Sequence, residues 1–189
     1  MSPVKRKALV ATTIAVVLVA TAGALYIYYA TDLHLPPEYR WGREGTLKLD
    51  LALERTEISV NESLNYTVTI TNVGKERVRL YMGYSGAWTS LLDDTNQTPR
   101  YFGPMMAPPP RPDDERFNSM MKVLEPGKNI TQSGRYANHT AGGGYHDIQP
   151  GRTYHVIAGY SCSDERSYPA LPHWQGELSS GAKYFTIRE

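Results

Sequence analysis

Two different hydrophobic patterns divide the chain. From Ala8 to Ala30 the sequence is an apolar run of 23 residues without a charge. As a helix with about 1.5 Å rise per residue, this run would span about 34 Å, more than the ~30 Å hydrocarbon core of a bilayer. From Leu47 onward, apolar residues instead recur at every second position, which is typical of half-buried strands. The pattern predicts one transmembrane helix followed by a β domain.

Basic residues before the apolar run predict its orientation. Lys5, Arg6 and Lys7 precede it, and positive charge is retained on the cytoplasmic side of a membrane. We therefore expect a single-pass protein of the cell membrane with a cytoplasmic N-terminus and an extracytoplasmic C-terminal domain. Its predicted parts are a basic tail (1–7), a transmembrane signal anchor (8–30), a stalk or linker (31–45) and an extracytoplasmic domain (46–189).

A cleaved signal peptide is the alternative interpretation of the same apolar run. The tripeptides Ala20-Thr-Ala22 and Ala22-Gly-Ala24 both fit a small-residue cleavage site. The run continues well past these sites, however, and this length favours an anchor.

The clearest strand follows Ser63. Leu64, Tyr66, Val68 and Ile70 fall on one side of this predicted strand and polar residues on the other. The segment 72–75 resembles a turn, so we expect Val78, Leu80 and Met82 to return beside it as the second strand of a hairpin.

In the rest of the domain, strand-like segments again alternate with segments typical of turns. Further strands are predicted at 88–92 and from Tyr154 to Tyr160, and the segment 103–114, with five prolines, is predicted to be a surface loop. No helix is expected between the strands. Short strands with turns between them predict a mainly β fold, an antiparallel β-sandwich.

Charge and cysteine content narrow the class of protein. The chain has 20 basic and 19 acidic residues, and without Lys5, Arg6 and Lys7 the balance is 17 to 19, or −2. Such a near-neutral body argues against a nucleic-acid partner. The single cysteine, Cys162, excludes a disulfide within the chain. We expect it to be a small half-buried side chain near a strand end.

Glycosylation motifs are enriched after the apolar run. Five of the seven asparagines are followed by the Asn-x-Ser/Thr pattern, where about one would be expected by chance. They are Asn61, Asn65, Asn96, Asn129 and Asn138. This enrichment supports an outer-surface location, and these residues are the candidate glycosylation sites.

No constellation predicts a reaction. His139, His146 and His155 lie near Cys162 in sequence, but their spacing fits no zinc or type-1 copper motif. His155 alternates with Tyr154 and Val156, so we expect it on the solvated side of its strand. The segment 113–115, Asp-Asp-Glu, is interpreted as solvated loop charge. We therefore predict no catalytic residue, no cofactor and no metal site.

Apolar residues in the loops are the best candidates for contact with a partner. Met105, Met106 and Pro109 lie in the proline-rich loop, and His173 and Trp174 in another. Such residues are typical of interaction surfaces when they are exposed. The open alternative is that they pack over the end of the β domain.

The order of motifs resembles a known extracytoplasmic family. Its parts here are ISVNESLNYTVTITNVGKERVRLYM, VLEPGKNIT, IQPGRTYHVIAGY and WQGELSSGAKYFTI, between Thr46 and Arg188. They resemble the immunoglobulin-like domains of the BsuPI-type proteinase-inhibitor family, through a Thr-Asn-Val-Gly turn, a Leu-Glu-Pro-Gly turn and a Pro-Gly-x-Tyr strand start. The resemblance implies an immunoglobulin-like β-sandwich. The chain has no recognisable inhibitory segment, so inhibition is not implied.

These observations lead to a ranked hypothesis. We expect a non-enzymatic, membrane-anchored module that binds a protein or cell-envelope partner. A structural component of a cell-surface assembly and an envelope metalloprotein are the alternatives. The sequence does not predict the oligomeric state.

Overall fold

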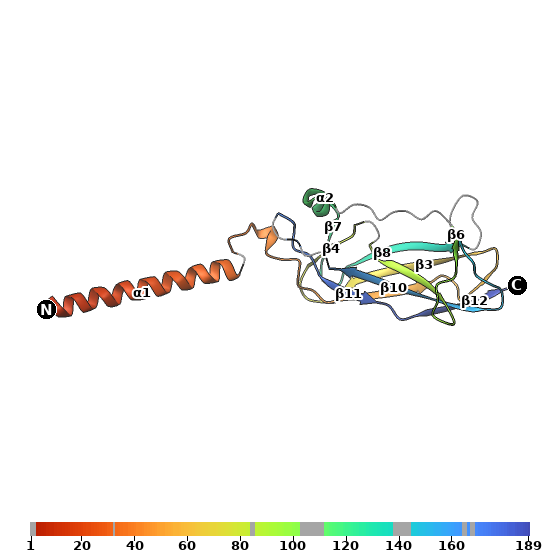
Figure 1. Cartoon of the computed structure of the whole chain (residues 1–189), viewed down its shortest axis with the longest axis horizontal. Helices are drawn as coiled ribbons and strands as arrows, with labels where there is room; N and C mark the ends of the chain where they lie inside the picture. The colour runs from red at the N-terminus through yellow and green to blue at the C-terminus, as the bar shows by residue number, and fades with distance from the viewer. Residues whose placement is uncertain are drawn as a thin grey trace. The chain divides into compact units, whose positions relative to one another are not determined.

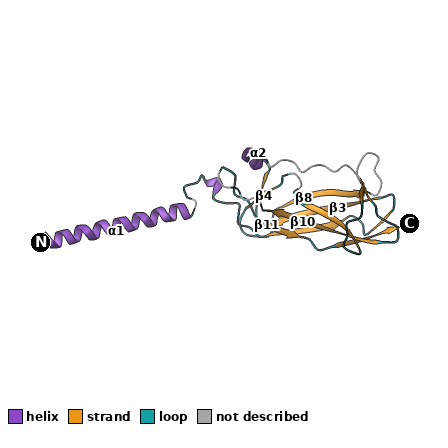
Figure 2. Cartoon of the chain, in the orientation of Figure 1, coloured by secondary structure: helices purple, strands orange, loops and turns teal. Residues whose placement is uncertain are grey.

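The chain forms two compact units, Met1–Trp41 and Gly42–Glu189. A computed structural model describes residues 3–31, 33–83, 86–102, 112–137, 145–163, 166 and 169–189. The first unit is helical, and the second consists of strands joined by loops, with one short helix (Figures 1 and 2).

The apolar run forms one long helix, α1 (Pro3–Ala30). Its segment Thr13–Ala30 has a mean hydropathy of 1.8, and none of this segment is buried within the protein. A helix of this length and composition is suited to cross a membrane, although a signal sequence has the same properties. A single 3₁₀ turn, η1 (Pro37–Tyr39), follows before the β domain begins.

The first sheet of the β domain has three antiparallel strands in the order β1–β3–β8. They are β1 (Leu47–Leu53), β3 (Ser63–Asn72) and β8 (Asn129–Ala137). β3 lies in the middle, with Ile70 opposite Leu49 on one side and Ile130 on the other. The alternation predicted for 47–53 and 64–71 is therefore confirmed.

The second sheet is centred on β10 (Thr153–Cys162). It pairs with β5 (Trp88–Asp93) along one edge and with β12 (Lys183–Arg188) and then β11 (Gly176–Ser179) along the other. The short strand β2 (Glu57–Ser59) joins the free edge of β12 in parallel orientation, whereas the other pairings are antiparallel.

Two small ribbons complete the strands. β4 (Val78–Tyr81) pairs with β7 (Met121–Leu124), and β6 (Tyr101–Phe102) pairs with β9 (Tyr145–His146). The expected hairpin between 64–71 and 78–82 is wrong, because β3 pairs with β8 and β4 with β7. The chain turns a corner at Asn72 instead, so both strands continue beside the same partner segment.

The buried side chain of Asn72 makes this corner. Its Nδ2 donates to the carbonyl oxygens of Glu76 at 2.8 Å and Leu124 at 2.9 Å, and its Oδ1 accepts from the N–H of Gly74 at 3.0 Å. The side chain is fully buried. Because each of these polar groups has a partner, the hydrogen bonds offset the desolvation of the buried amide.

A short helix, α2 (Asp114–Ser119), interrupts the strands, so the expectation of no helix is wrong. Asp113 caps it by accepting from the N–H of Arg116 at 2.8 Å, and Asp114 and Glu115 occupy its first turn. The acidic run 113–115 is therefore a helix start, where negative charge is favoured by the helix dipole.

One hydrophobic core lies between the two sheets. Leu64, Val68 and Ile70 contribute from β3, and Tyr154, Val156 and Ala158 from β10, all in a single buried cluster. Cys162 is 5% exposed and belongs to the same core, more deeply buried than expected. Each sheet therefore has one face in the core and one outer face, and the outer faces are where a partner has access.

Candidate functional site

The outer side of the β1–β3–β8 sheet is polar and is called the hydroxyl face below. Strand register places its residues in four rows across the three strands. The rows are Lys48–Thr71–Asn129, Asp50–Thr69–Thr131, Ala52–Thr67–Ser133 and Glu54–Asn65–Arg135. Its charges balance, with two basic and two acidic side chains, so it has no net electrostatic preference for a ligand.

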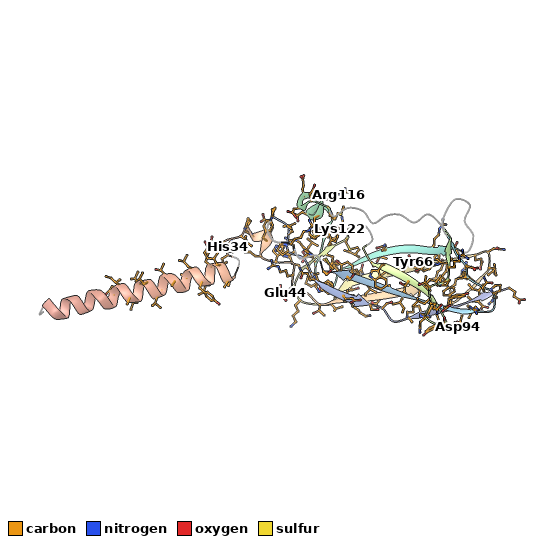
Figure 3. All side chains as sticks on the ribbon, viewed as in Figure 1. His34, Glu44, Tyr66, Asp94, Arg116 and Lys122 are labelled. Carbon is orange, nitrogen blue, oxygen red and sulfur yellow. The ribbon has the colours of Figure 1, made fainter. Side chains whose placement is uncertain are left out.

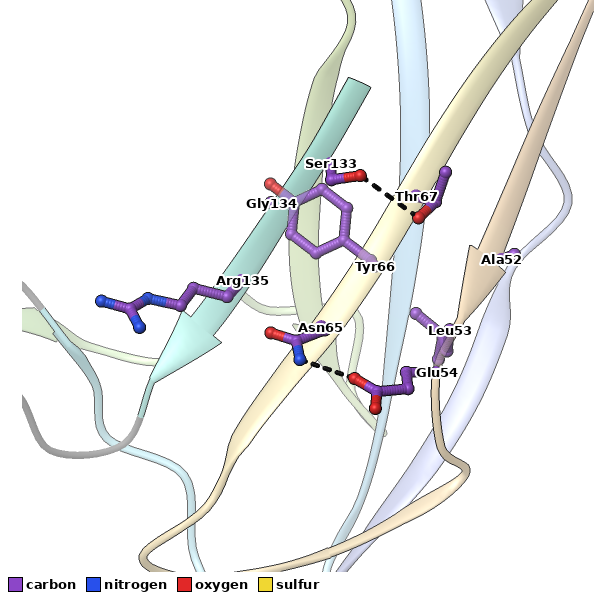
Figure 4. A pocket seen from close by; sticks show the side chains of 9 residues that line it. All are labelled: Ala52, Leu53, Glu54, Asn65, Tyr66, Thr67, Ser133, Gly134 and Arg135. Carbon is purple, nitrogen blue, oxygen red and sulfur yellow. Dashed lines mark hydrogen bonds between the residues drawn. The ribbon is translucent and has the colours of Figure 1, made fainter. Parts of the chain in front are cut away.

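An open groove of about 640 Å³ lies over the last two rows of the hydroxyl face (Figure 4). Asn65 Nδ2 donates to Glu54 Oε2 at 2.6 Å, and the hydroxyls of Thr67 and Ser133 are 3.5 Å apart. Figure 4 shows the ring of Tyr66 beside Gly134. The groove offers an amide, two hydroxyls, a carboxylate and the guanidinium of Arg135. Among these groups, the hydroxyls of Thr67 and Ser133 are hydrogen-bonded to each other and not to a basic side chain.

The outer side of the second sheet is different and is called the aromatic face below. Register on either side of β10 places Trp88 beside Gly159, Ser90 beside Ile157, and Leu92 beside His155 and then Tyr184. The aromatic face consists of Trp88, Ser90, Leu92, His155, Ile157 and Tyr184. No charged side chain belongs to these rows, although Glu57, Glu177 and Arg188 lie on the same side of the sheet in other rows. Trp88 and Tyr184 are 39% and 61% exposed.

A glycine positions the exposed tryptophan. A Cβ atom at Gly159 would lie 2.1 Å from Trp88 Cζ2, so the indole occupies the space above the Gly159 backbone. Glycine in a central strand is otherwise unfavourable because it loses more chain entropy and offers no side chain to pack. Here it lets the indole rest on the sheet, which fixes a large apolar group at the surface.

Tyr184 shields His155 from solvent. The two rings lie with centroids 5.2 Å apart, and His155 is only 6% exposed. His155 is on the outer side of β10, as the alternation predicts, but the expectation that it is solvated is wrong. Its cross-strand neighbours Tyr184 and Leu92 cover it, which makes it part of the floor of the aromatic face.

The structure shows no exposed contact surface formed by the loop residues that were predicted to bind a partner, among those that it describes. Met105, Met106 and Pro109 lie outside the residues that the structure describes. His173 is 2% exposed, and its ring packs edge-on against Phe117 with centroids 5.1 Å apart. The half-buried Trp174 packs against Tyr160 at 5.8 Å. His173 and Trp174 therefore pack onto the domain and offer a partner little surface.

Phe117 is the centre of this packed end of the domain. It stacks on Tyr81 with centroids 4.4 Å apart, and the guanidinium carbon of Arg166 lies 4.0 Å from the centre of its ring. Arg166 also pairs with Asp114 at 3.0 Å. This arrangement attaches α2 to β4 and gives the cluster a structural role.

The sequon asparagines lie at the surface. Asn61, Asn65, Asn96 and Asn129 are all exposed, and Asn138 lies outside the described residues. Asn96 follows Asp94, which Figure 3 shows at the end of the β domain opposite Arg116 and Lys122.

Among the described residues, no group of three or more His, Cys, Asp or Glu side chains is placed to hold a metal ion.

A hydroxyl triad joins the two sheets near the groove. Tyr136 donates to Thr89 Oγ1 at 2.8 Å, and Thr89 donates to Tyr66 Oη at 3.0 Å. Burial raises the pKa of Tyr136 to about 12, against the weaker opposing effect of its hydrogen bond to Thr89. Tyr136 is therefore a neutral structural donor at physiological pH, unsuited to act as a base.

The sequence analysis did not predict the aromatic face, because its candidate contact residues were all in loops. The outward positions of Trp88 and Tyr184 follow from alternation along their strands. That they lie on one sheet surface depends on the pairing of both strands with β10, which alternation does not reveal.

Comparisons with known proteins identify no family. No family profile matches the chain, and no curated protein matches it. Among solved structures, a mutant β-glucosidase from Listeria innocua in complex with laminaribiose aligns at 16% identity, with a TM-score of 0.30, over 75% of this chain and 17% of that chain. A glucose complex of the β-glucosidase from Listeria innocua aligns at 15% identity, with a TM-score of 0.28, over 73% and 16% of the two chains. The chain thus spans about a sixth of those enzymes, at a similarity too low to indicate a shared fold or activity.

Proposed function

We propose that this chain is a non-enzymatic, membrane-anchored binding module that presents its aromatic face to a partner protein of the cell envelope. The apolar helix α1 is the proposed anchor, with the basic residues before it in the cytoplasm and the β domain outside. The β domain is proposed to be an immunoglobulin-like β-sandwich, and the resemblance to the BsuPI-type family is part of this proposal. Protease inhibition is not.

The observation that carries the proposal is the exposed indole of Trp88 among the uncharged side chains on the outer side of β5 and β10. Tryptophan and tyrosine are enriched among the residues that dominate the binding energy of interfaces, and the centres of interfaces are depleted in charge. The Gly159 backbone holds the indole in place in the free protein. Little conformational entropy would then be lost on binding.

The size of the aromatic face favours a transient complex. Three strands about 4.8 Å apart and about 20 Å long offer on the order of 300 Å². Stable protein interfaces bury about 800 Å² on each partner. We therefore expect micromolar or weaker affinity, and covalent capture in intact cells suits such a complex better than purification.

Site-specific crosslinking in cells that make the full chain tests the proposal. Ser90 lies mid-strand on the aromatic face and Thr69 lies mid-strand on the hydroxyl face. A photoreactive phenylalanine analogue at position 90 should crosslink to one other protein, and the same analogue at position 69 should not. The position-90 product should disappear when Trp88→Ala is added, because the anchor of the interface is then removed.

Each other result overturns the proposal. A product with the mass of two copies of this chain would support the structural-assembly alternative. Equal products from positions 69 and 90, or a product that survives Trp88→Ala, would show that capture does not depend on the aromatic face.

A further inference from the structure

The seven asparagines of this chain fall into two groups with different roles. Two of them, Asn72 and Asn118, are not in a sequon. Both hold the fold together: Asn72 makes the corner after β3, and Asn118 donates to the carbonyl of Pro169 at 3.1 Å and accepts from the N–H of Leu171 at 2.7 Å. The five others are all in sequons.

Three of the four described sequon asparagines have no comparable structural role; the exception is Asn96, whose left-handed backbone (φ 61°) favours asparagine. The four described ones are exposed, and among them Asn65 makes a side-chain bond to exposed Glu54. Asparagine is unfavourable in strands, yet Asn65 and Asn129 both lie in strands of the same sheet. A structural account explains Asn72 and Asn118 but gives no reason for asparagine at positions 65 and 129.

The geometry at both strand positions suits modification of the amide. In an extended strand, residues two apart point to the same side, so Thr67 shares the outer face with Asn65, and Thr131 shares it with Asn129. The amide and the hydroxyl of each sequon therefore both face solvent. One N–H of Asn65 is bonded to Glu54 at 2.6 Å, which leaves the second N–H for substitution.

We infer that the hydroxyl face is a glycan-bearing surface, with N-linked glycans on Asn65 and Asn129. The inference rests on the extracytoplasmic placement in the proposed function. The donor is a lipid-linked oligosaccharide with a phosphate or diphosphate at C1 of its first sugar, and a membrane glycosyltransferase supplies the catalysis. The C1–O bond to the phosphate breaks, the Nδ2–C1 bond forms, the amide loses one proton, and the lipid phosphate leaves with the electron pair of the broken bond.

The two acceptors are placed to cover the whole face. Asn129 lies opposite Thr71, six residues from Asn65 along β3, which corresponds to about 20 Å along the sheet. Glycans at both ends would exclude other proteins from the rows between them. A docking partner would then have access to the aromatic face on the other sheet, which has no sequon in its rows.

Peptide mass spectrometry of the full chain, extracted from the membranes of its own cells, tests the inference. Peptides containing Asn65 and Asn129 should each carry added sugar mass in most molecules. Thr67→Val, which keeps the β-branched shape and removes the hydroxyl, should abolish the mass on Asn65 and leave it on Asn129. Thr67→Ser, the matched control, should retain both, and Thr131→Val should give the converse result.

Surface labelling of intact cells separates failure of this inference from failure of the proposed function. A membrane-impermeant amine reagent should reach Lys48, which lies on the hydroxyl face with a side chain 62% exposed. If Lys48 is labelled and both peptides have unmodified masses, the glycan inference is wrong and the membrane placement stands. If Lys48 is protected until the cells are broken, the extracytoplasmic placement is wrong, and the inference with it.

Discussion

The two outer faces of the β domain have the same architecture and opposite chemistry. Each is formed by a central strand with neighbours on both sides. Along each strand, the side chains point alternately to the outer face and to the buried core. The hydroxyl face fills its rows with threonine, serine and balanced charges, whereas the aromatic face has Trp88, Ile157 and Tyr184 and no charge. The burial of the inner side constrains one half of each strand, and the other half is free to serve function.

The largest effect on stability is expected at the corner between β3 and β4. Asn72→Ala leaves two carbonyls and one N–H without their side-chain partner in a buried corner. We expect the free energy of unfolding to fall by about 3 kcal/mol. Chemical denaturation of unglycosylated full-length protein would measure it.

A surface asparagine beside the same corner is the matched control. Asn129→Ala should change the free energy of unfolding by less than about 0.5 kcal/mol, because the side chain is exposed. Equal losses for the two variants would contradict the separation of structural and sequon asparagines.

An intermediate effect is expected on the aromatic face. Gly159→Ala places a methyl group 2.1 Å from Trp88 Cζ2, so the indole has to move. We expect a loss of about 1–3 kcal/mol in unfolding free energy, together with loss of the crosslink from position 90. Gly181→Ala has no heavy atom within 4 Å of its new Cβ and should leave both unchanged. Similar behaviour of the two alanine variants would show that Gly159 does not position the indole.

The smallest effect concerns the triad that joins the sheets under the two faces. Tyr136→Phe removes the donor to Thr89, and we expect a loss of about 1 kcal/mol at pH 7. Since the pKa of Tyr136 is raised to about 12 in the folded state, against about 10 in the unfolded state, its contribution is present below pH 10 and lost as pH rises toward 12.

Denaturation at pH 7 and pH 11 tests this dependence. The wild type should lose more stability between the two values than Tyr136→Phe does. Burial also raises the pKa of Tyr160, so the variant should retain part of the alkaline loss. An identical pH dependence of the two proteins would exclude Tyr136 as a source of alkaline sensitivity.

The sequence predicted the strands much better than their partners. Alternation identified β1 and β3 and the side of each that faces the core, because burial imposes a period of two. It could not reveal that β4 pairs with β7, because Val78 and Leu80 would face inward in either arrangement. For Asn72, whose buried side chain makes the corner, the sequence predicts only a turn.

Two local errors have identifiable signals. Asp113, followed by acidic residues and then Phe117, fits a helix cap with a favourable first turn, and reading it as loop charge missed α2. Alternation predicts the correct side of β10 for His155, but the burial of His155 depends on Tyr184, which is 29 residues later in the chain. The aromatic face was missed for the same reason, since it is assembled by strand pairing.

The attachment of the β domain to its leading segment has a mechanical consequence. Gly42 joins β4 through a parallel bridge to Val78, with the N–H of Arg79 donating to the Gly42 oxygen at 3.1 Å, five residues before β1 begins at Leu47. Tension applied along the chain from the helix would load this junction before it reaches the first long strand. Peeling residues 42–46 away would extend the tether by at most about 17 Å with β1 still in its sheet. Under the proposed function, residues 42–46 would lengthen first when a bound partner pulls on the anchored protein.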